Sequence, residues 1–140
     1  MWNENIIDCW SWIIRYTWNV IKSFQDLEVY KEALNLATEI NELIKKHPND
    51  EKYLLVDQMK RASRAIAPII AEGYAKRGSI KTLQKYMNDA VGESNEMLSH
   101  LELSIRFKYL TSEKGKELVE RYGILGKKMT NLKNNWQNFK

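Results

Sequence analysis

Residues 58–78 read QMKRASRAIAPIIAEGYAKRG, and this stretch combines an apolar helical rhythm with basic residues near both ends. In and just before it, apolar side chains recur at intervals of three and four: Leu55, Met59, Ala62, Ile66 and Ile69. This spacing places them on one face of an α-helix. Lys60, Arg61 and Arg64 fall off that stripe, so they face solvent or a partner. We therefore expect a helix with a core side and a basic side.

Pro68 interrupts the regularity of this helix. A proline lacks the backbone N–H and its ring crowds the preceding turn, so we expect the helix to bend there. The bend lets the chain wrap around its neighbours. The alternative, that it widens a groove, stays open from the sequence.

Amphipathic helices extend outward from this stretch in both directions. Residues 26–46 place two adjoining sets of apolar residues on a wide stripe: Leu27, Tyr30, Leu34, Ala37 and Ile44, with Leu36, Ile40 and Leu43 beside them. His47-Pro48-Asn49-Asp50 breaks the run, because a proline disfavours helix in the residue before it. We expect the next helix to begin near Asp50 and to end at Gly73 or Gly78.

Two further helices follow. Ser79 is a suitable cap for a helix that runs to about Tyr109, with its inward residues at Leu83, Met87, Ala90, Ser94, Leu98, Leu101 and Ile105. Thr111 or Ser112 opens the last helix, in which apolar residues step by four and three: Leu118, Tyr122, Leu125, Met129, Leu132 and Trp136. Four such helices with short connections predict an all-α fold, an antiparallel up-down four-helix bundle over residues 21–140.

The first 20 residues, MWNENIIDCWSWIIRYTWNV, hold four of the five tryptophans of the chain. One interpretation is an additional N-terminal helix, for a membrane surface or for a partner. The other is an upstream extension of a protein that begins near Ile21. Glu4 and Asp8 stand where a secretory signal needs basic residues, and polar residues interrupt every window long enough to span a membrane. With the lone Cys9, which cannot form an intrachain disulfide, this favours a cytoplasmic protein.

Charge is unevenly distributed along a chain of formal net charge +4. Residues 52–85 carry eight Lys/Arg against two Asp/Glu, and residues 106–140 carry nine against three. Residues 1–51 and 86–105 are acidic in balance. Clusters of Lys and Arg bind phosphates, because each neutralised phosphate releases a counterion and arginine adds a bidentate fork. An ordinary solvated helix face is the alternative interpretation.

The candidate phosphate contacts fall in the two basic segments. The first set is Lys60, Arg61, Arg64, Lys76, Arg77, Lys81 and Lys85, and the second is Lys127, Lys128 and Lys133. Tyr74 and Tyr86 lie near the first set and could stack on bases, although tyrosines at this spacing are more often core or rim residues.

No catalytic or metal-binding constellation is expected. His47 and His100 have no cysteine or second histidine at ligand spacing, so a zinc site is not predicted. Glu93, Glu96 and His100 resemble half of a di-iron site, but the other helices do not repeat the motif, and salt bridges to the basic helices are the expected role. We predict no cofactor.

The chain resembles the four-helix-bundle proteins encoded in intervening sequences of bacterial 23S rRNA genes. The similar phrases are IKSFQDLEVYK at 21–31, Gln58, Arg61 and Ala62, IAEGY at 70–74, then Ala90, Gly92, Asn95, Glu96 and Leu101, and Tyr109-Leu110. The same broad family resembles the accessory protein of diversity-generating retroelements. The chain departs from the pattern at Ala67 and Ile69, where the family has proline and asparagine, and at Asp89 and Glu93.

The resemblance implies a non-enzymatic bundle that assembles into a ring-shaped homo-oligomer, with a pentamer as the expected form, and binds nucleic acid. We therefore expect binding of RNA or DNA phosphates with little sequence readout. The rival interpretation is a protein–protein scaffold that docks a partner such as a reverse transcriptase. Its basic and acidic segments would then pair between subunits.

Overall fold

The computed structural model describes residues 21–136. Four α-helices make up most of them: α2 (Glu28–Leu43), α3 (Leu55–Ala75), α4 (Ile80–Arg106) and α5 (Ser112–Asn134). Three short 3-10 helices accompany them: η1 (Phe24–Asp26), η2 (Ile44–Lys46) and η3 (Asn49–Glu51). The described part of the chain contains no strand, which confirms the all-α prediction. The Trp-rich residues 1–20, and any helix predicted there, lie outside the described residues.

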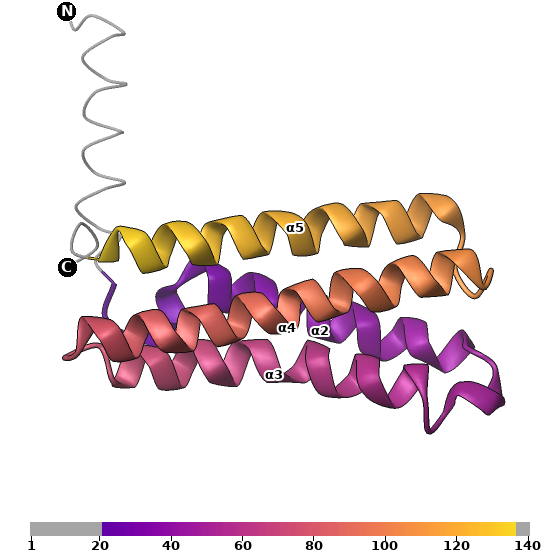
Figure 1. Cartoon of the computed structure of the whole chain (residues 1–140), viewed down its shortest axis with the longest axis horizontal. Coiled ribbons are helices and arrows are strands. Elements are labelled where there is room, and N and C mark those ends of the chain that lie inside the picture. Colours follow the sequence, from indigo (N-terminus) through magenta and orange to yellow (C-terminus); the bar gives the residue numbers. More distant parts are fainter. Residues whose placement is uncertain (1–20, 137–140) are drawn as a thin grey trace, which may run out of the picture.

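The helices run alternately up and down the bundle (Figure 1). α3 packs against α2 and α4, whereas α5 packs against α4 and less extensively against α2. α3 and α5 therefore occupy opposite corners. We call the end that holds the α3–α4 turn, residues 76–79, the proximal end; α2 begins and α5 ends there too. The opposite end, with η3 and the α4–α5 turn, is the distal end.

The helix caps confirm two predicted boundaries and correct others. The hydroxyl of Ser79 accepts a hydrogen bond from the amide of Thr82, and Thr111 accepts one from Lys114. α3 starts at Leu55 instead of Asp50, because residues 49–51 form η3 and the backbone before the helix leaves the helical region. α4 ends at Arg106 and not at the predicted Tyr109. Just after the helix, Lys108 takes a left-handed φ of 63°. α2 spans Glu28–Leu43 rather than 26–46, with η2 continuing it.

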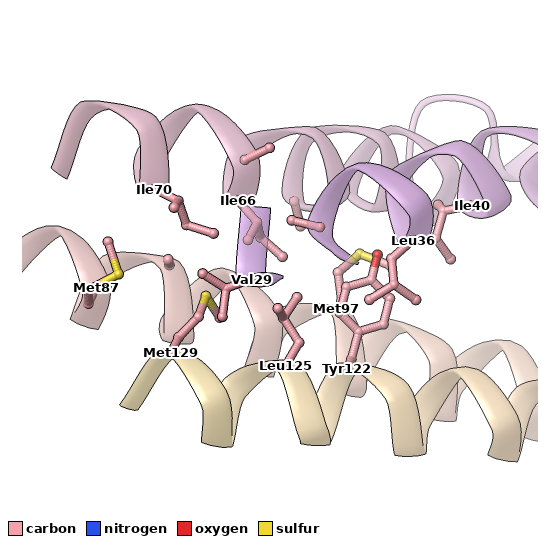
Figure 2. Packing of buried hydrophobic residues seen from close by; sticks show 14 of the residues in the cluster. Val29, Leu36, Ile40, Ile66, Ile70, Met87, Met97, Tyr122, Leu125 and Met129 are labelled. Atoms are coloured by element: carbon pink, nitrogen blue, oxygen red, sulfur yellow. The ribbon is translucent and has the colours of Figure 1, made fainter. Parts of the chain in front are cut away.

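The core lies between the four helices, and Figure 2 shows its apolar side chains pointing inward. All six residues predicted to face inward from the last helix are buried: Leu118, Tyr122, Leu125, Met129, Leu132 and Trp136. α2 buries a face offset from the predicted one: Val29, Ala33, Leu36 and Ile40. Leu34 is 44% exposed, so its predicted core position was wrong. Residues two positions apart on an α-helix point in directions about 200° apart around its axis. Leu34 therefore points away from the core when Leu36 is buried.

α4 is also rotated slightly from the predicted face. Met97 and Ser104 are fully buried there, whereas Leu98 and Ile105 are half-buried. On α3, Ile70 is fully buried and Ile69 only half-buried.

Pro68 lies within α3 on its exposed side, and the helix continues through it to Ala75. Near the proximal end, α3 and α4 approach closely at Gly73. A Cβ atom there would lie 2.7 Å from the Cβ of Tyr86. The missing side chain therefore permits the helix contact. None of the described helices is long and apolar enough to cross a membrane.

Candidate nucleic-acid interface

Arg61 does not face solvent as a free cation. Its guanidinium lies 3.2 Å from Glu93 Oε1 and also pairs with Glu96, so it bridges α3 to two carboxylates of α4. The hydrogen bond to Glu96 raises the pKa of Arg61, and the same bond lowers the pKa of Glu96. The pairing assigns Arg61 to the helix–helix contact, although the sequence placed it among the phosphate contacts.

The other two basic residues of α3 lack a carboxylate partner in residues 21–136. Arg64 donates a hydrogen bond of 3.0 Å to the side-chain carbonyl of Asn41 on α2. Lys60 makes no side-chain contact of this kind with the described residues and is exposed. Both cations are available to an external anion.

At the end of α3, the side chains of Lys76, Glu72 and Tyr86 each contact the other two. The Lys76 ammonium lies 3.2 Å from Glu72 and donates to the Tyr86 hydroxyl at 2.7 Å, and that hydroxyl donates to Glu72 at 3.0 Å. The bond to Tyr86 is the main reason that the pKa of Lys76 is raised. Lys76 and Lys85 also lie 4.9 and 5.4 Å from the centre of the Tyr86 ring. Tyr86 is thus already in contact with two lysines of the same chain.

Arg77 lies in the α3–α4 turn and stacks on Tyr74. Its guanidinium carbon is 4.1 Å from the centre of that ring, and Nη1 donates to the Tyr74 carbonyl at 3.0 Å. Tyr74 is buried and meets Trp136 edge to face at 5.9 Å. Tyr74 is therefore a core residue rather than a base-stacking platform, while Arg77 keeps donors for a ligand.

The remaining predicted contacts lie on α4 and α5. Lys85 is 3.5 Å from Asp89, and Lys128 pairs with Glu28 of α2. Lys133 donates to the side chain of Asn88 at 3.0 Å. Lys81 and Lys127 have no such partner among the described residues, and both are exposed.

The ten predicted residues therefore divide into two groups. Four are bound to carboxylates of the same chain: Arg61, Lys76, Lys85 and Lys128. Six make no ion pair within residues 21–136, and we call them the open cations: Lys60, Arg64, Arg77, Lys81, Lys127 and Lys133. They do not form one continuous face, because α3 and α5 lie at opposite corners. Arg77, Lys81, Lys127 and Lys133 share the proximal half of the bundle.

An ion-pair network along the seam between α2 and α5 was not predicted. Arg121 lies 3.1 Å from Glu32 and also pairs with Glu39, which Lys114 approaches at 3.3 Å. Burial opposes the charge of Arg121, but its bonds to Glu39 and Glu32 raise its pKa overall. The sequence showed the charges but not their partners, which lie more than 70 residues away.

A buried His–Ser pair was also missed. His47 is 6% exposed, and its Nε2 lies 3.0 Å from the Ser104 hydroxyl. Ser104 also approaches the sulfur of Met59 at 3.7 Å. Burial lowers the pKa of His47, which favours the neutral ring. No local signal could have shown this pair, because the two residues are 57 positions apart.

The Glu93–Glu96–His100 pattern has a structural role. His100 Nε2 lies 3.3 Å from Glu96, which Arg61 also binds. Within residues 21–136, no group of three or more His, Cys, Asp and Glu side chains could hold a metal ion. The predicted salt bridges to a basic helix are therefore present.

These features define a class of protein: an all-helical bundle of four antiparallel helices with intrachain ion pairs along its seams and a set of open cations. The chain belongs to the family of 23S rRNA-intervening sequence proteins, whose sequence profile matches residues 25–131. It is similar to the crystal structure of a protein with unknown function from the S23 ribosomal protein family of Bacteroides thetaiotaomicron. The two share 26% sequence identity with a TM-score of 0.69, over 76% of this chain and 96% of the other. A comparison with curated proteins finds no match.

Proposed function

We propose that this protein is a non-enzymatic, cytoplasmic bundle that binds the phosphates of RNA or DNA through its open cations. We further propose that it acts as a ring-shaped homo-oligomer, with a pentamer as the expected form. Membership of the 23S rRNA-intervening sequence family is consistent with a nucleic-acid partner, and the proposal does not depend on base recognition.

The observation that carries the proposal is the asymmetry between acids and bases in the ion pairs. Acids such as Glu32, Glu39, Glu93 and Glu96 are neutralised within the chain. Six of the predicted cations remain without an ion pair in the described residues, and four of these share the proximal half. In the proximal half, Glu28, Glu72 and Asp89 are each paired with a lysine of the same chain. The open cations there give that surface an excess of positive charge, which attracts a polyanion.

A ring strengthens such binding without any new contact. Each subunit supplies a few cations, and several copies engage one polymer at high effective concentration. A modest patch on one subunit is therefore sufficient for measurable affinity.

The test is the salt dependence of binding to a structured RNA and to duplex DNA. The variant Lys60→Ala/Lys81→Ala/Lys127→Ala removes three open cations that lack hydrogen-bond partners among the described residues, and it leaves the Arg61 bridge intact. The slope of log K against log salt should shrink by roughly 0.7 to 0.9 for each phosphate that the variant no longer neutralises. Light scattering in the same buffers reports whether the oligomeric mass is kept.

The matched control is Lys52→Ala/Arg106→Ala/Lys108→Ala, which removes the same charge at the distal end. The control should retain most of the wild-type slope. An equal reduction of the slope in both variants would show that binding depends on net charge alone and not on the open cations. An intact oligomer that binds neither polymer at low salt would refute the proposal.

The second candidate function is a protein–protein scaffold, for example for a reverse transcriptase, and the distal end favours it. Four of the six exposed large hydrophobic side chains of the described chain lie there: Tyr53, Leu54, Leu103 and Phe107. Exposed apolar groups in one place are typical of protein contacts. Replacing Tyr53 and Phe107 by Ser should abolish partner capture under this function and leave RNA binding unchanged under the first one.

A further inference from the structure

The bundle has four seams, the lines along which neighbouring helices meet, and they differ in how their charged side chains are paired. Every ion pair that joins two helices of the described chain lies in the α3–α4 seam or in the α2–α5 seam. The α2–α3 and α4–α5 seams hold none within residues 21–136. Because α3 and α5 occupy opposite corners, these two seams lie on opposite sides of the bundle.

In each of these two seams, one open cation is joined to the neighbouring helix by an asparagine side chain. Arg64 of α3 donates to the side-chain oxygen of Asn41 on α2 at 3.0 Å. Lys133 of α5 donates to the side-chain oxygen of Asn88 on α4, also at 3.0 Å. We call Arg64 and Lys133 the amide-bound cations. The chain therefore places a neutral partner where the other two seams have carboxylates.

An amide holds a cation in place without cancelling its charge. The guanidinium of Arg64 has five N–H donors and the ammonium of Lys133 has three, so one bond to an amide leaves donors for a ligand. A carboxylate partner neutralises the cation, as Glu96 does for Arg61 one turn earlier on α3. Each amide bond also orients a long side chain, which lowers the entropy cost of ordering that side chain in a complex.

The surroundings of the two bonds are poor in free acids. The positions three and four residues before and after all four bonded residues hold no Asp or Glu. The acids next to the two asparagines, Glu42 and Asp89, are paired with Lys45 and Lys85. The potential around each amide-bound cation is therefore positive, which favours a phosphate at its remaining donors.

We propose that Asn41 and Asn88 are positioning residues, which hold the two amide-bound cations ready to bind phosphates of a nucleic-acid strand. The phosphate contacts then lie in the α2–α3 and α4–α5 seams, one on each side of the bundle. This inference rests on the proposed function, and it adds the seams where a strand binds and the residues that orient the contacts.

The test replaces each amide by a carboxylate of nearly the same shape. Asn41→Asp/Asn88→Asp turns both hydrogen bonds into ion pairs and removes no cation. The slope of log K against log salt for a structured RNA should shrink by roughly 0.7 to 0.9 for each amide-bound cation that no longer binds a phosphate. Circular dichroism and light scattering report whether the fold and the oligomeric mass are kept. A role of the asparagines in packing alone would leave the slope unchanged.

The matched control is Asn35→Asp/Asn49→Asp, which adds the same negative charge away from the two bonds. Both asparagines are exposed, and neither makes a side-chain hydrogen bond within residues 21–136. The slope of this control should stay close to that of the wild type. A further variant, Asn41→Leu/Asn88→Leu, keeps the charge of both cations but removes their orientation. It should weaken binding several-fold at an unchanged slope, and wild-type affinity in this variant would overturn the positioning role.

A double-mutant cycle tests whether each asparagine acts through its own cation. Arg64→Gln should remove one phosphate contact from the slope, and the addition of Asn41→Asp should cause no further loss. Lys133→Gln and Asn88→Asp should behave in the same way. Additive losses would show that the new carboxylates act through net charge, which would overturn the inference.

The outcomes separate this inference from the proposed function. A wild-type protein that binds RNA with a steep salt dependence, together with equal slopes for the Asp variant and its control, supports the proposed function and overturns the role of the asparagines. An intact oligomer that binds neither RNA nor DNA at low salt refutes both. Loss of slope in the Asp variant alone, with a non-additive cycle, supports both.

Discussion

The close approach of α3 and α4 at Gly73 predicts opposite effects for the same substitution at two helical positions. Gly73→Ala would place a Cβ atom 2.7 Å from the Cβ of Tyr86 and 3.1 Å from the Met87 methyl carbon. The Cβ of Tyr86 is fixed to its backbone, so a rotamer change cannot relieve the contact. The two helices would have to separate. Gly92→Ala in α4 would add a Cβ that meets nothing within 4 Å.

The magnitudes follow from these distances. Carbon atoms prefer a separation of about 3.5–4.0 Å, so the helices must move apart by about 1 Å. Overpacking of this kind costs about 1–3 kcal/mol. Alanine gains about 0.5–1 kcal/mol over glycine inside a helix. Gly73→Ala should therefore lower the free energy of unfolding by roughly 0.5–2 kcal/mol, and Gly92→Ala should raise it by about 0.5–1 kcal/mol.

Urea unfolding followed by circular dichroism measures both changes. With a slope of about 1–3 kcal/mol per molar urea, the midpoints of the two variants should differ by roughly 1 M. Unfolding is repeated at several protein concentrations, because assembly would add to the apparent stability. Gly123→Ala in α5, where a Cβ is also free of contacts, serves as a second control. A Gly73→Ala protein as stable as Gly92→Ala would refute the interhelical distance on which the reasoning rests.

Three further substitutions test the buried and paired polar groups. Because the folded-state pKa of His47 is lowered, the unfolded chain binds more protons. Stability should therefore fall as the pH drops below about 6.5, and His47→Gln should flatten that part of a stability–pH profile. Tyr122 has a buried hydroxyl without a partner in the described residues; Tyr122→Phe should leave the urea midpoint unchanged or raise stability by up to about 1 kcal/mol. Arg61→Gln should cost at most about 1 kcal/mol in low salt and less in 1 M NaCl, measured by urea unfolding.

The periodicity of the sequence predicted the helices because burial repeats with the helical turn. α5 shows this best, since every residue of its predicted stripe is buried, from Leu118 to Trp136. α2 shows the limit. Its stripe is apolar over so wide an arc that the sequence offered two faces, and only the positions of the neighbouring helices selected Leu36 over Leu34. The non-helical backbone before Leu55 likewise depends on packing rather than on a local cap.

The candidate site was predicted less completely than the fold, for a physical reason. Composition shows how many cations a segment has, but not which carboxylate each one reaches. Arg61 and Lys60 are adjacent in sequence, yet one bridges to α4 and the other is free of ion pairs within the described residues. The tyrosines show the same limit, because Tyr86 is covered by Lys76 and Lys85 only once α3 and α4 are side by side. Spacing along one helix contains no information about the opposite helix.

α2 begins and α5 ends at the proximal end, so the two ends of the bundle lie in the same half as four of the open cations: Arg77, Lys81, Lys127 and Lys133. An affinity tag or fluorescent protein fused directly to residue 21 or 136 would be tethered near the α3–α4 turn and would compete with ligands there. Immobilisation through such a tag would hold that end against the resin. Binding measurements should therefore use the protein after tag removal. The same proximity makes the bundle suited to circular permutation, with a linker joining its two ends and new termini opened at the distal α4–α5 turn.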